Sequence, residues 1–275
     1  MLPISTISLL ILIFVSPLGC IAAWAQTGQS SQPADENTAK LRLLIPNEEF
    51  LPAAIRAKQA DDFDNPAFPY VQAGEAAWSK PEGAAGKACQ NCHGAKPENL
   101  VKNAVAAYPK FSRAANDVIS LPTRINICRV NALQAPALPA GSERMIDMTA
   151  YLRWNARGLP ATVDVNGPAG AAFEKGRELY FKKIGLLQLS CAQCHNQNFG
   201  QKFAGETLSQ AHAVSYPVFS LGEKRMISLH ERFRMCNQLA RAEPQPIGSP
   251  DYVALELYLN WRSEDLPITA PGVRP

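Results

Sequence analysis

Charged residues are scarce in this sequence, and neither sign of charge dominates. Only 19% of the 275 residues are charged, the formal net charge is +3, and there is no basic run. A protein that binds nucleic acid normally shows a basic patch, so the composition excludes this class. Long stretches that alternate apolar and polar residues are also missing, which argues against a large sheet. Histidine occurs at only four positions, so few imidazoles are available as metal ligands.

The first 25 residues contain no charged side chain. Residues 7–15 are strongly apolar, and the last three of the 25 have the small-x-small form of a signal-peptidase site. This pattern predicts a signal peptide over residues 1–25, export to the periplasm, and a mature chain without a membrane span. The basic start of a typical signal is missing, so an uncleaved anchor and a lipidated Cys20 are alternatives. Residues 26–47 are predicted to be a disordered leader, because Ser, Gln and Thr are common there.

The chain also contains an internal repeat. Equivalent residues 102 positions apart are Val71 and Phe173, Gly74 and Gly176, Trp78 and Tyr180, and Cys89 and Cys191. Further pairs, at offsets of 107 or 108, are Tyr108-Pro109 with Tyr216-Pro217, Cys128 with Cys236, and Tyr151-Leu152 with Tyr258-Leu259. Two copies of one domain are therefore predicted, at residues 48–160 and 161–275, and Gly, Pro and Asn cluster where they join.

Each copy is predicted to consist of helices joined by long loops. Residues 168–181 begin with proline and place Phe173, Gly176 and Tyr180 on one helical face. The last helix of each copy, near residues 143–155 and 250–261, has an apolar stripe that suits core packing. Because glycine lets two backbones approach closely, we expect the first and last helices of each copy to cross in contact.

Each copy contains one C-x-x-C-H motif. The motif residues are Cys89, Cys92 and His93 in the first copy, and Cys191, Cys194 and His195 in the second. Two thiols at this spacing can add to the two vinyl groups of one haem, and the histidine then lies under the iron. Zinc would require four ligands per site, and a thioredoxin-like motif would follow a strand. The motifs predict two covalently bound haem c groups in an all-α chain of two tandem cytochrome c-like haem domains, related by internal duplication.

The second axial ligand of each iron must come from elsewhere in the sequence. His212 and His230 both belong to the second copy, and Met145 and Met148 lie on a packing stripe. What the copies share is a downstream cysteine, 35 residues after the motif histidine in the first copy and 41 in the second.

The roles open to these cysteines, Cys128 and Cys236, are iron ligand, partner in a disulfide with one another, and inert buried thiol. Export favours disulfides, whereas equivalent positions in separate copies favour a place beside each haem. Arginines near both cysteines would lower a thiol pKa and so suit a thiolate ligand. These arginines are Arg124 and Arg129 in the first copy, and Arg232, Arg234 and Arg241 in the second.

The segment around the second cysteine resembles a known family. The run Glu231-Arg232-Phe233-Arg234-Met235-Cys236-Asn237-Gln238, followed by Arg241-Ala242-Glu243-Pro244, resembles the active-site segment of the SoxA family. The run Ile127-Cys128-Arg129-Val130-Asn131-Ala132 fits the dihaem form of that family. The resemblance extends over residues 41–267. It implies that Cys128 is the distal ligand of the first haem, that Cys236 is both the distal ligand of the second haem and a catalytic cysteine held as a persulfide, and that Arg232 binds thiosulfate.

SoxA proteins are the catalytic cytochrome subunits of the SoxAX complex, an L-cysteine S-thiosulfotransferase. The resemblance therefore implies that thiosulfate is coupled to a cysteine thiol of the carrier protein SoxYZ, and that two electrons pass through haem to the partner cytochrome SoxX. Arg232 and Cys236 are four residues apart and would share one face of a helix. A carrier thiol also needs an open cleft beside Cys236. Alternative roles for Arg232 are a solvated surface charge and a haem propionate partner.

Other functions also fit the motifs. They are a dihaem thiosulfate dehydrogenase that forms tetrathionate, a plain electron-transfer dihaem cytochrome c, and a non-catalytic binding subunit of a respiratory assembly. For the first haem, a structural role, a relic of duplication and a second electron store are all open.

Overall fold

The computed structural model describes residues 44–275, apart from the side chain of Asn103. The predicted signal peptide, Cys20 and most of the predicted leader lie outside the described residues. No helix within residues 44–275 combines the length and the apolar character that are needed to cross a membrane.

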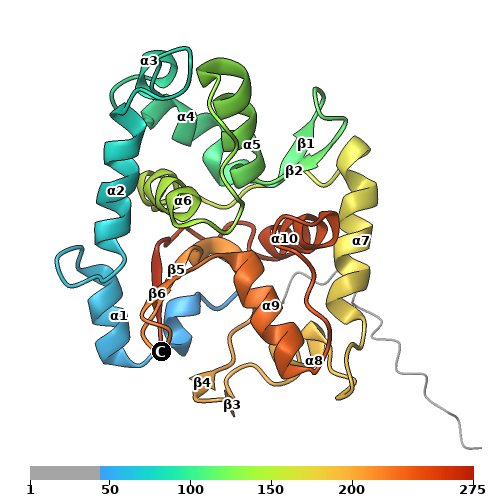
Figure 1. Cartoon of the computed structure of the whole chain (residues 1–275). Helices are drawn as coiled ribbons and strands as arrows, with labels where there is room; N and C mark the ends of the chain where they lie inside the picture. The colour runs from blue at the N-terminus through green and yellow to red at the C-terminus, as the bar shows by residue number, and fades with distance from the viewer. Residues whose placement is uncertain (1–43) are drawn as a thin grey trace, which may run out of the picture. The chain divides into compact units, whose positions relative to one another are not determined.

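Helices dominate the described chain, as the sequence predicts (Figure 1). The α-helices are α1 (Ala53–Ala60), α2 (Phe68–Ser79), α3 (Gln90–His93), α4 (Glu98–Asn103), α5 (Leu121–Cys128), α6 (Glu143–Asn155), α7 (Gly170–Phe181), α8 (Cys191–His195), α9 (Leu229–Leu239) and α10 (Pro250–Arg262). Short 3-10 helices are η2 (Asn47–Phe50), η3 (Val105–Ala107), η5 (Gly167–Ala169) and η6 (Ala213–Ser215), and a π-helical turn, η4 (Arg129–Leu133), follows α5.

The strands are only two or three residues long. They are β1 (Lys110–Ser112), β2 (Asp117–Ile119), β3 (Lys202–Phe203), β4 (Glu206–Thr207), β5 (Val218–Ser220), β6 (Arg225–Ile227) and β7 (Gly272–Arg274). β1 pairs with β2 and β3 with β4, both antiparallel. β5 pairs antiparallel with β6 and parallel with β7, with Val218 opposite Gly272. Such strands are too short to leave a period in the sequence, so the sequence did not reveal them.

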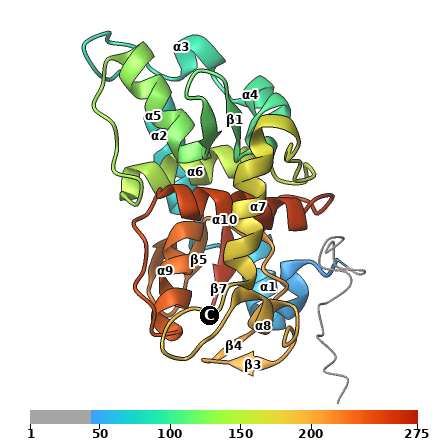
Figure 2. The same ribbon diagram turned by 90° about the vertical axis from the view of Figure 1, so that its right-hand side faces the viewer.

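The same helix crossing occurs in each copy, and a glycine makes it possible. α2 packs against α6, and α7 packs against α10 (Figures 1 and 2). A Cβ atom on Gly74 would lie 2.2 Å from the carbonyl oxygen of Asp147, and one on Gly176 would lie 2.0 Å from that of Ala254. Any larger residue would push the helices apart, so the predicted close crossing is confirmed.

The predicted helices largely agree with the structure. α6 covers residues 143–155 as predicted, and α10 extends one residue beyond 250–261. The segment predicted at 168–181 begins as the 3-10 helix η5 and continues as α7. Met145 and Met148 are buried, at 0% and 5% exposed, and Met148 belongs to the core around α2 and α6.

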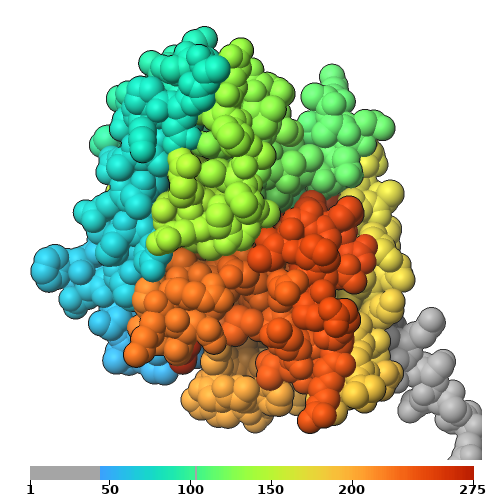
Figure 3. Space-filling model, in the orientation of Figure 1, coloured from blue at the N-terminus to red at the C-terminus, as the bar shows by residue number. Residues whose placement is uncertain are grey.

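The two copies pack directly on one another. On the face in Figure 3 the first copy (cyan to green) meets the second (orange to red). Met226 and Ile268 of the second copy join the core of the first, and Pro160 pairs with Pro267 in an isolated bridge. The predicted boundaries, 48–160 and 161–275, stay a prediction.

The first residues of the described chain pack on the second copy. The side-chain amide of Asn47 in η2 donates to the carbonyl oxygen of His212 at 2.8 Å. The side-chain oxygen of Gln59 in α1 accepts from the backbone N–H of Val273 in β7 at 2.9 Å. Residues from both ends of the described chain therefore surround the second C-x-x-C-H motif, whereas α3 with the first motif lies at the opposite end in both views (Figures 1 and 2).

Candidate active site at the second haem motif

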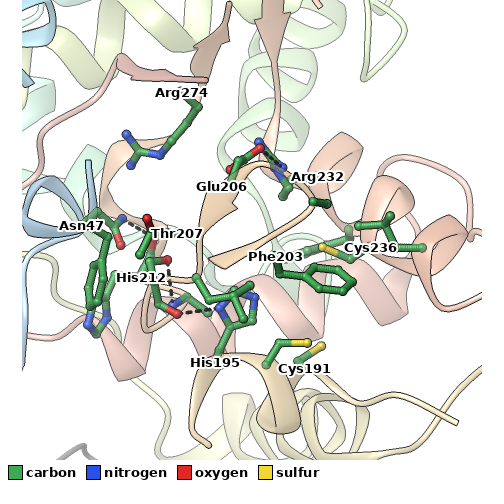
Figure 4. Close-up of a pocket in the computed structure, with 18 of the residues that line it drawn as sticks. Asn47, Cys191, His195, Phe203, Glu206, Thr207, His212, Arg232, Cys236 and Arg274 are labelled. Carbon is green, nitrogen blue, oxygen red and sulfur yellow. Dashed lines mark hydrogen bonds and ion pairs between the residues drawn. The ribbon is translucent and has the colours of Figure 1, made fainter. Parts of the chain in front are cut away.

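A pocket beside α8 collects the predicted residues of the second copy (Figure 4). Cys191, Cys194 and His195 line it from α8, and Arg232 and Cys236 line it from α9. Further lining residues come from η2, the β3–β4 hairpin, α10 and β7: among them are Asn47, Phe203, Glu206, Leu255, Leu259 and Arg274. The structure thus brings together all five residues that the sequence predicted for this site.

A capping box fixes the start of α8. The Ser190 hydroxyl accepts from the backbone N–H of Gln193 at 3.2 Å, and the Gln193 side chain accepts from the backbone N–H of Ser190 at 2.8 Å. Both orphan donors at this helix start are therefore paired. The helix is only five residues long, so the cap decides where the two thiols and the histidine point.

The imidazole of His195 is oriented for an iron ligand. Its Nδ1 lies 2.7 Å from the carbonyl oxygen of Ser209. A carbonyl can only accept, so Nδ1 carries the proton and Nε2 keeps its lone pair. Burial lowers the pKa of His195, which keeps the ring neutral. A neutral imidazole held by a carbonyl at its other nitrogen is the usual form of a metal-bound histidine. The residues therefore fit a haem attached through Cys191 and Cys194.

Arg232 and Cys236 face the same pocket from one helix. A second capping box, between Ser228 and Glu231, starts α9, and Arg232 and Cys236 follow one turn apart. The predicted shared face is confirmed.

Arg232 is held near the pocket wall by a carboxylate. Its Nη1 donates to Glu206 of β4 at 3.1 Å, and its Nε is buried without a partner. The neighbouring Tyr216 raises the pKa of Arg232. Glu206 adds to this effect and burial opposes it, so the guanidinium stays charged. A charged fork with an unused donor is suited to a tetrahedral oxyanion.

Cys236 is half-buried and forms no disulfide in the described chain. Burial raises the pKa of the Cys236 thiol, and Arg232 lowers it only in part. The expectation that nearby arginines depress this pKa is therefore wrong for the net effect, because burial outweighs the guanidinium. Arg234 instead donates to the carbonyl oxygen of Gln245 at 2.6 Å, and Arg241 is exposed. A thiolate here depends on coordination to a metal, which deprotonates a bound thiol.

The first motif has different surroundings. Cys89 and His93 are half-buried, Cys92 is exposed, and the ring of Trp78 lies 5.8 Å from that of His93. Cys128 ends α5, is free and is half-buried. Cys128 is among the charges that raise the pKa of Cys89, after the burial of Cys89 itself. Cys128 thus lies close to its own C-x-x-C-H motif, as the equivalent positions predicted, and no disulfide joins it to Cys236 in the described chain.

Sequence reasoning missed several residues of the second pocket. Glu206 and Phe203 lie on the β3–β4 hairpin, between His195 and Cys236. This stretch is longer than the equivalent stretch of the first copy. That extra length was the one available signal. Asn47 and Arg274 reach the pocket from distant parts of the chain, and nothing in their local sequence marks them.

Comparison with known proteins supports the same interpretation. Residues 73–161 and 175–268 match the SoxA/TsdA cytochrome c domain family. The subunit SoxA of the L-cysteine S-thiosulfotransferase of Rhodovulum sulfidophilum is 38% identical over 80% of this chain and 76% of its own length. The chain belongs to the SoxA family. The SoxA subunit of Pseudaminobacter salicylatoxidans is 35% identical over 82% of the chain and 79% of its own length.

A solved structure extends the SoxA likeness to the fold. The crystal structure of SoxXA from P. pantotrophus superposes with a TM-score of 0.80 at 30% identity, covering 84% of this chain and 87% of the other. The cytochrome c domain of the SoxA family implies covalently bound haem c, and the family match in two segments agrees with two tandem cytochrome c-like domains.

Proposed function

We propose that this SoxA-family chain is the catalytic cytochrome subunit of an L-cysteine S-thiosulfotransferase. In the reaction, the sulfane sulfur of thiosulfate forms an S–S bond with a cysteine of the carrier SoxYZ, and the S–H bond of that cysteine breaks. One proton and two electrons are released for each S–S bond formed. The observation that carries the proposal is the placement of Arg232 and Cys236, one turn apart, in the pocket that also holds the second C-x-x-C-H motif.

Each site residue has a role in the proposal. Arg232 binds the sulfonate of thiosulfate, because its charged fork matches an oxyanion and its Nε lacks a partner. Cys236, held as a persulfide, is the reactive sulfur and also the distal ligand of the second haem. The half-buried position of Cys236 in an accessible pocket suits a carrier thiol that must enter.

The proposal also includes two haem c groups. Cys89 and Cys92 attach the first, with His93 and Cys128 as axial ligands. Cys191 and Cys194 attach the second, with His195 and Cys236. When bound, the haems supply an outlet for the electrons that the S–S bond formation releases. The orientation of His195 by Ser209 supports this assignment for the second haem.

The proposal includes partners and a compartment. The matched SoxXA structure supports a SoxX-type cytochrome as the subunit that receives the electrons. SoxYZ and thiosulfate follow from the name of the relatives. Export to the periplasm by the signal peptide at residues 1–25 is part of the same proposal.

The test combines the purified chain, its partner cytochrome, the carrier and thiosulfate. The expected result is a carrier whose cysteine peptide gains one thiosulfonate group by mass spectrometry while the partner cytochrome is reduced. Before the reaction, the Cys236 peptide should contain one extra sulfur atom. Tetrathionate formed without any carrier would instead identify a thiosulfate dehydrogenase. If neither product forms, the chain is an electron-transfer cytochrome only. A pyridine haemochrome assay should find two haems per chain.

A further inference from the structure

A buried arginine lies close to the histidine of the second haem motif. Arg262, the last residue of α10, is 1% exposed and is among the largest fully buried side chains of the described chain. Its Nη2 donates to the side-chain oxygen of Asn196 at 2.7 Å and to the carbonyl oxygen of Gln210 at 3.4 Å. Asn196 directly follows His195. Gln210 directly follows Ser209, whose carbonyl oxygen holds the His195 ring. Arg262 therefore binds both segments that orient this ring.

The surroundings of Arg262 favour a cation. The Cζ of its guanidinium lies 4.6 Å from the centre of the Tyr180 ring and 5.9 Å from that of the Tyr258 ring. The face of an aromatic ring attracts a cation, and the attraction is stronger where the cation is desolvated. The C-terminal end of a helix, where Arg262 lies, also carries a partial negative charge. These contacts stabilise a positive charge at a buried position.

The charge of Arg262 acts on the motif histidine. Burial is the main cause that lowers the pKa of His195, and Arg262 lowers it further, by more than Arg232 does. A charge that acts on this imidazole also acts on an iron bound to it, because Coulomb interactions are strong where water is excluded. Reduction adds one negative charge to a haem. A buried cation nearby therefore favours the reduced form.

The first copy has no charge at the equivalent position. α6 ends at Asn155, which is 107 positions before Arg262. The side-chain amide of Asn155 donates to the carbonyl oxygen of Tyr151, in its own helix, at 2.8 Å. The residue after the first motif histidine is Gly94, which has no side chain that could accept from an arginine. The helix end and the turn after the motif thus form without a buried cation.

We infer that Arg262 is a positioning residue whose buried charge raises the reduction potential of the second haem. This inference rests on the proposed function for the presence of that haem. A thiolate ligand donates electron density to iron and so favours the oxidised form. The buried cation, close to His195, opposes this effect. The copy whose sulfur chemistry releases electrons is thus the one whose haem accepts them more readily.

The test measures the reduction potential of each haem in the purified, haem-loaded chain, without thiosulfate or carrier. Arg262→Gln removes the charge but keeps a side-chain amide that can donate a hydrogen bond. It should shift the equilibrium of the second haem toward the oxidised form by roughly tenfold, which is about 59 mV for one electron. Arg262→Lys keeps a charge and should restore most of the original potential at pH 6. The first haem, followed separately by electron paramagnetic resonance, should keep its potential in both variants.

Asn196→Asp is an independent variant that leaves Arg262 in place. Its carboxylate should pair with the guanidinium and offset the charge, so the potential of the second haem should fall here too. Arg177→Gln is the matched control, because Arg177 on α7 is 35% exposed and pairs with Glu174 at 2.8 Å. Solvent screens a charge at such a position, so neither potential should change.

An unchanged second potential in both Arg262→Gln and Asn196→Asp would overturn the inference. So would an Arg262→Lys chain whose potential falls as far as that of Arg262→Gln, because the bonds of the arginine rather than its charge would then be responsible. If Arg262→Gln does not retain the second haem, Asn196→Asp decides between these outcomes. Haem content is counted before each titration. An unaltered chain without a second haem would contradict the proposed function, whereas a normal haem with an unchanged potential contradicts only the role of Arg262.

Discussion

Arg124 and Arg232 occupy equivalent positions, each four residues before a cysteine on a short helix, yet their surroundings differ. Arg124 is exposed, whereas Arg232 is half-buried and paired with Glu206 of the β3–β4 hairpin. The hairpin belongs to the longer stretch between motif and cysteine in the second copy. In the second copy, an added segment thus covers the same helical unit and lines a pocket with it.

The residue after each cysteine shows the same contrast. Arg129 follows Cys128 and forms an ion pair with Glu82 at 2.6 Å, with the two side chains 9% and 13% exposed. At the equivalent place in the second copy, Asn237 donates to the hydroxyl of Tyr252 at 3.2 Å. In the first copy a buried ion pair ties the helix end to the loop. At this position the second copy has no ion pair in the described residues. Its charged Arg232 instead lines the pocket, where it pairs with Glu206.

Replacing each cysteine in turn should give the largest difference between the copies. Cys236→Ala should abolish thiosulfate transfer, because it removes the reactive sulfur. Cys128→Ala should leave much of the activity, since Arg124, one turn before it, is exposed. Steady-state assays with purified carrier measure both. Equal losses would show that the chemistry is not confined to the second site.

The two arginines offer the next comparison. Arg232→Ala should raise the thiosulfate KM by roughly a hundredfold, the effect of losing about 2–3 kcal/mol from a charge-assisted contact. Arg232→Lys should restore only part of this, because an ammonium cannot make a planar two-point contact. Arg124→Ala, the matched control, should leave KM unchanged. An unchanged thiosulfate KM in the Arg232→Ala enzyme would show that Arg232 is only a structural charge.

Removing the carboxylate that holds Arg232 should act in the opposite direction. Glu206→Gln should lower the thiosulfate KM by roughly threefold to tenfold, because the anion no longer competes with a carboxylate for the guanidinium. Glu82→Gln breaks the ion pair of the first copy and should not alter KM. If Glu206→Gln raises KM instead, Glu206 serves to position Arg232 for the anion.

The smallest expected effect concerns the helix crossings. Asp147 in α6 corresponds to Ala254 in α10, and its Oδ1 is buried without a partner. Burial raises the pKa of Asp147 from 3.8 to about 6. The folded state therefore favours the protonated acid, and the chain loses stability as pH rises from about 4 to about 6.

Asp147→Ala copies the second crossing and should add about 1 kcal/mol to the free energy of unfolding at pH 7, after allowance for partial exposure of the carboxyl. The gain should shrink as pH falls below about 5. Denaturant unfolding at several pH values measures it. A gain that persists at pH 4 would point to packing rather than charge.

The sequence predicted the parts of the site that have local patterns. The C-x-x-C-H motifs, the four-residue spacing of Arg232 and Cys236, and the two glycine crossings each depend on residues within one or two turns. Glu206 and Arg274 had no such pattern. Glu206 stands on a strand of two residues, and β7 with Arg274 reaches the pocket only through pairing with β5. Contacts of this kind depend on the assembled fold, which periodicity does not describe.

Burial also changed an inference made from neighbouring residues alone. Arg234 and Arg241 are close to Cys236 in sequence, but the helix and the turn after it direct them elsewhere. Of these arginines, only Arg232 lowers the pKa of the Cys236 thiol, and its effect is smaller than that of burial. Counting charges along the chain could not show this, because a pKa depends on distance and solvent access in three dimensions.

The contact between α1 and β7 has a consequence for the order of folding. The bond between Gln59 and Val273 joins residues 214 positions apart. Contacts of such long range form slowly, because the loop between them must close first. The wall that Arg274 adds to the second pocket can therefore form only after nearly all of the described chain is available. We therefore expect the thiols of α8 to be more accessible before this wall forms than after it.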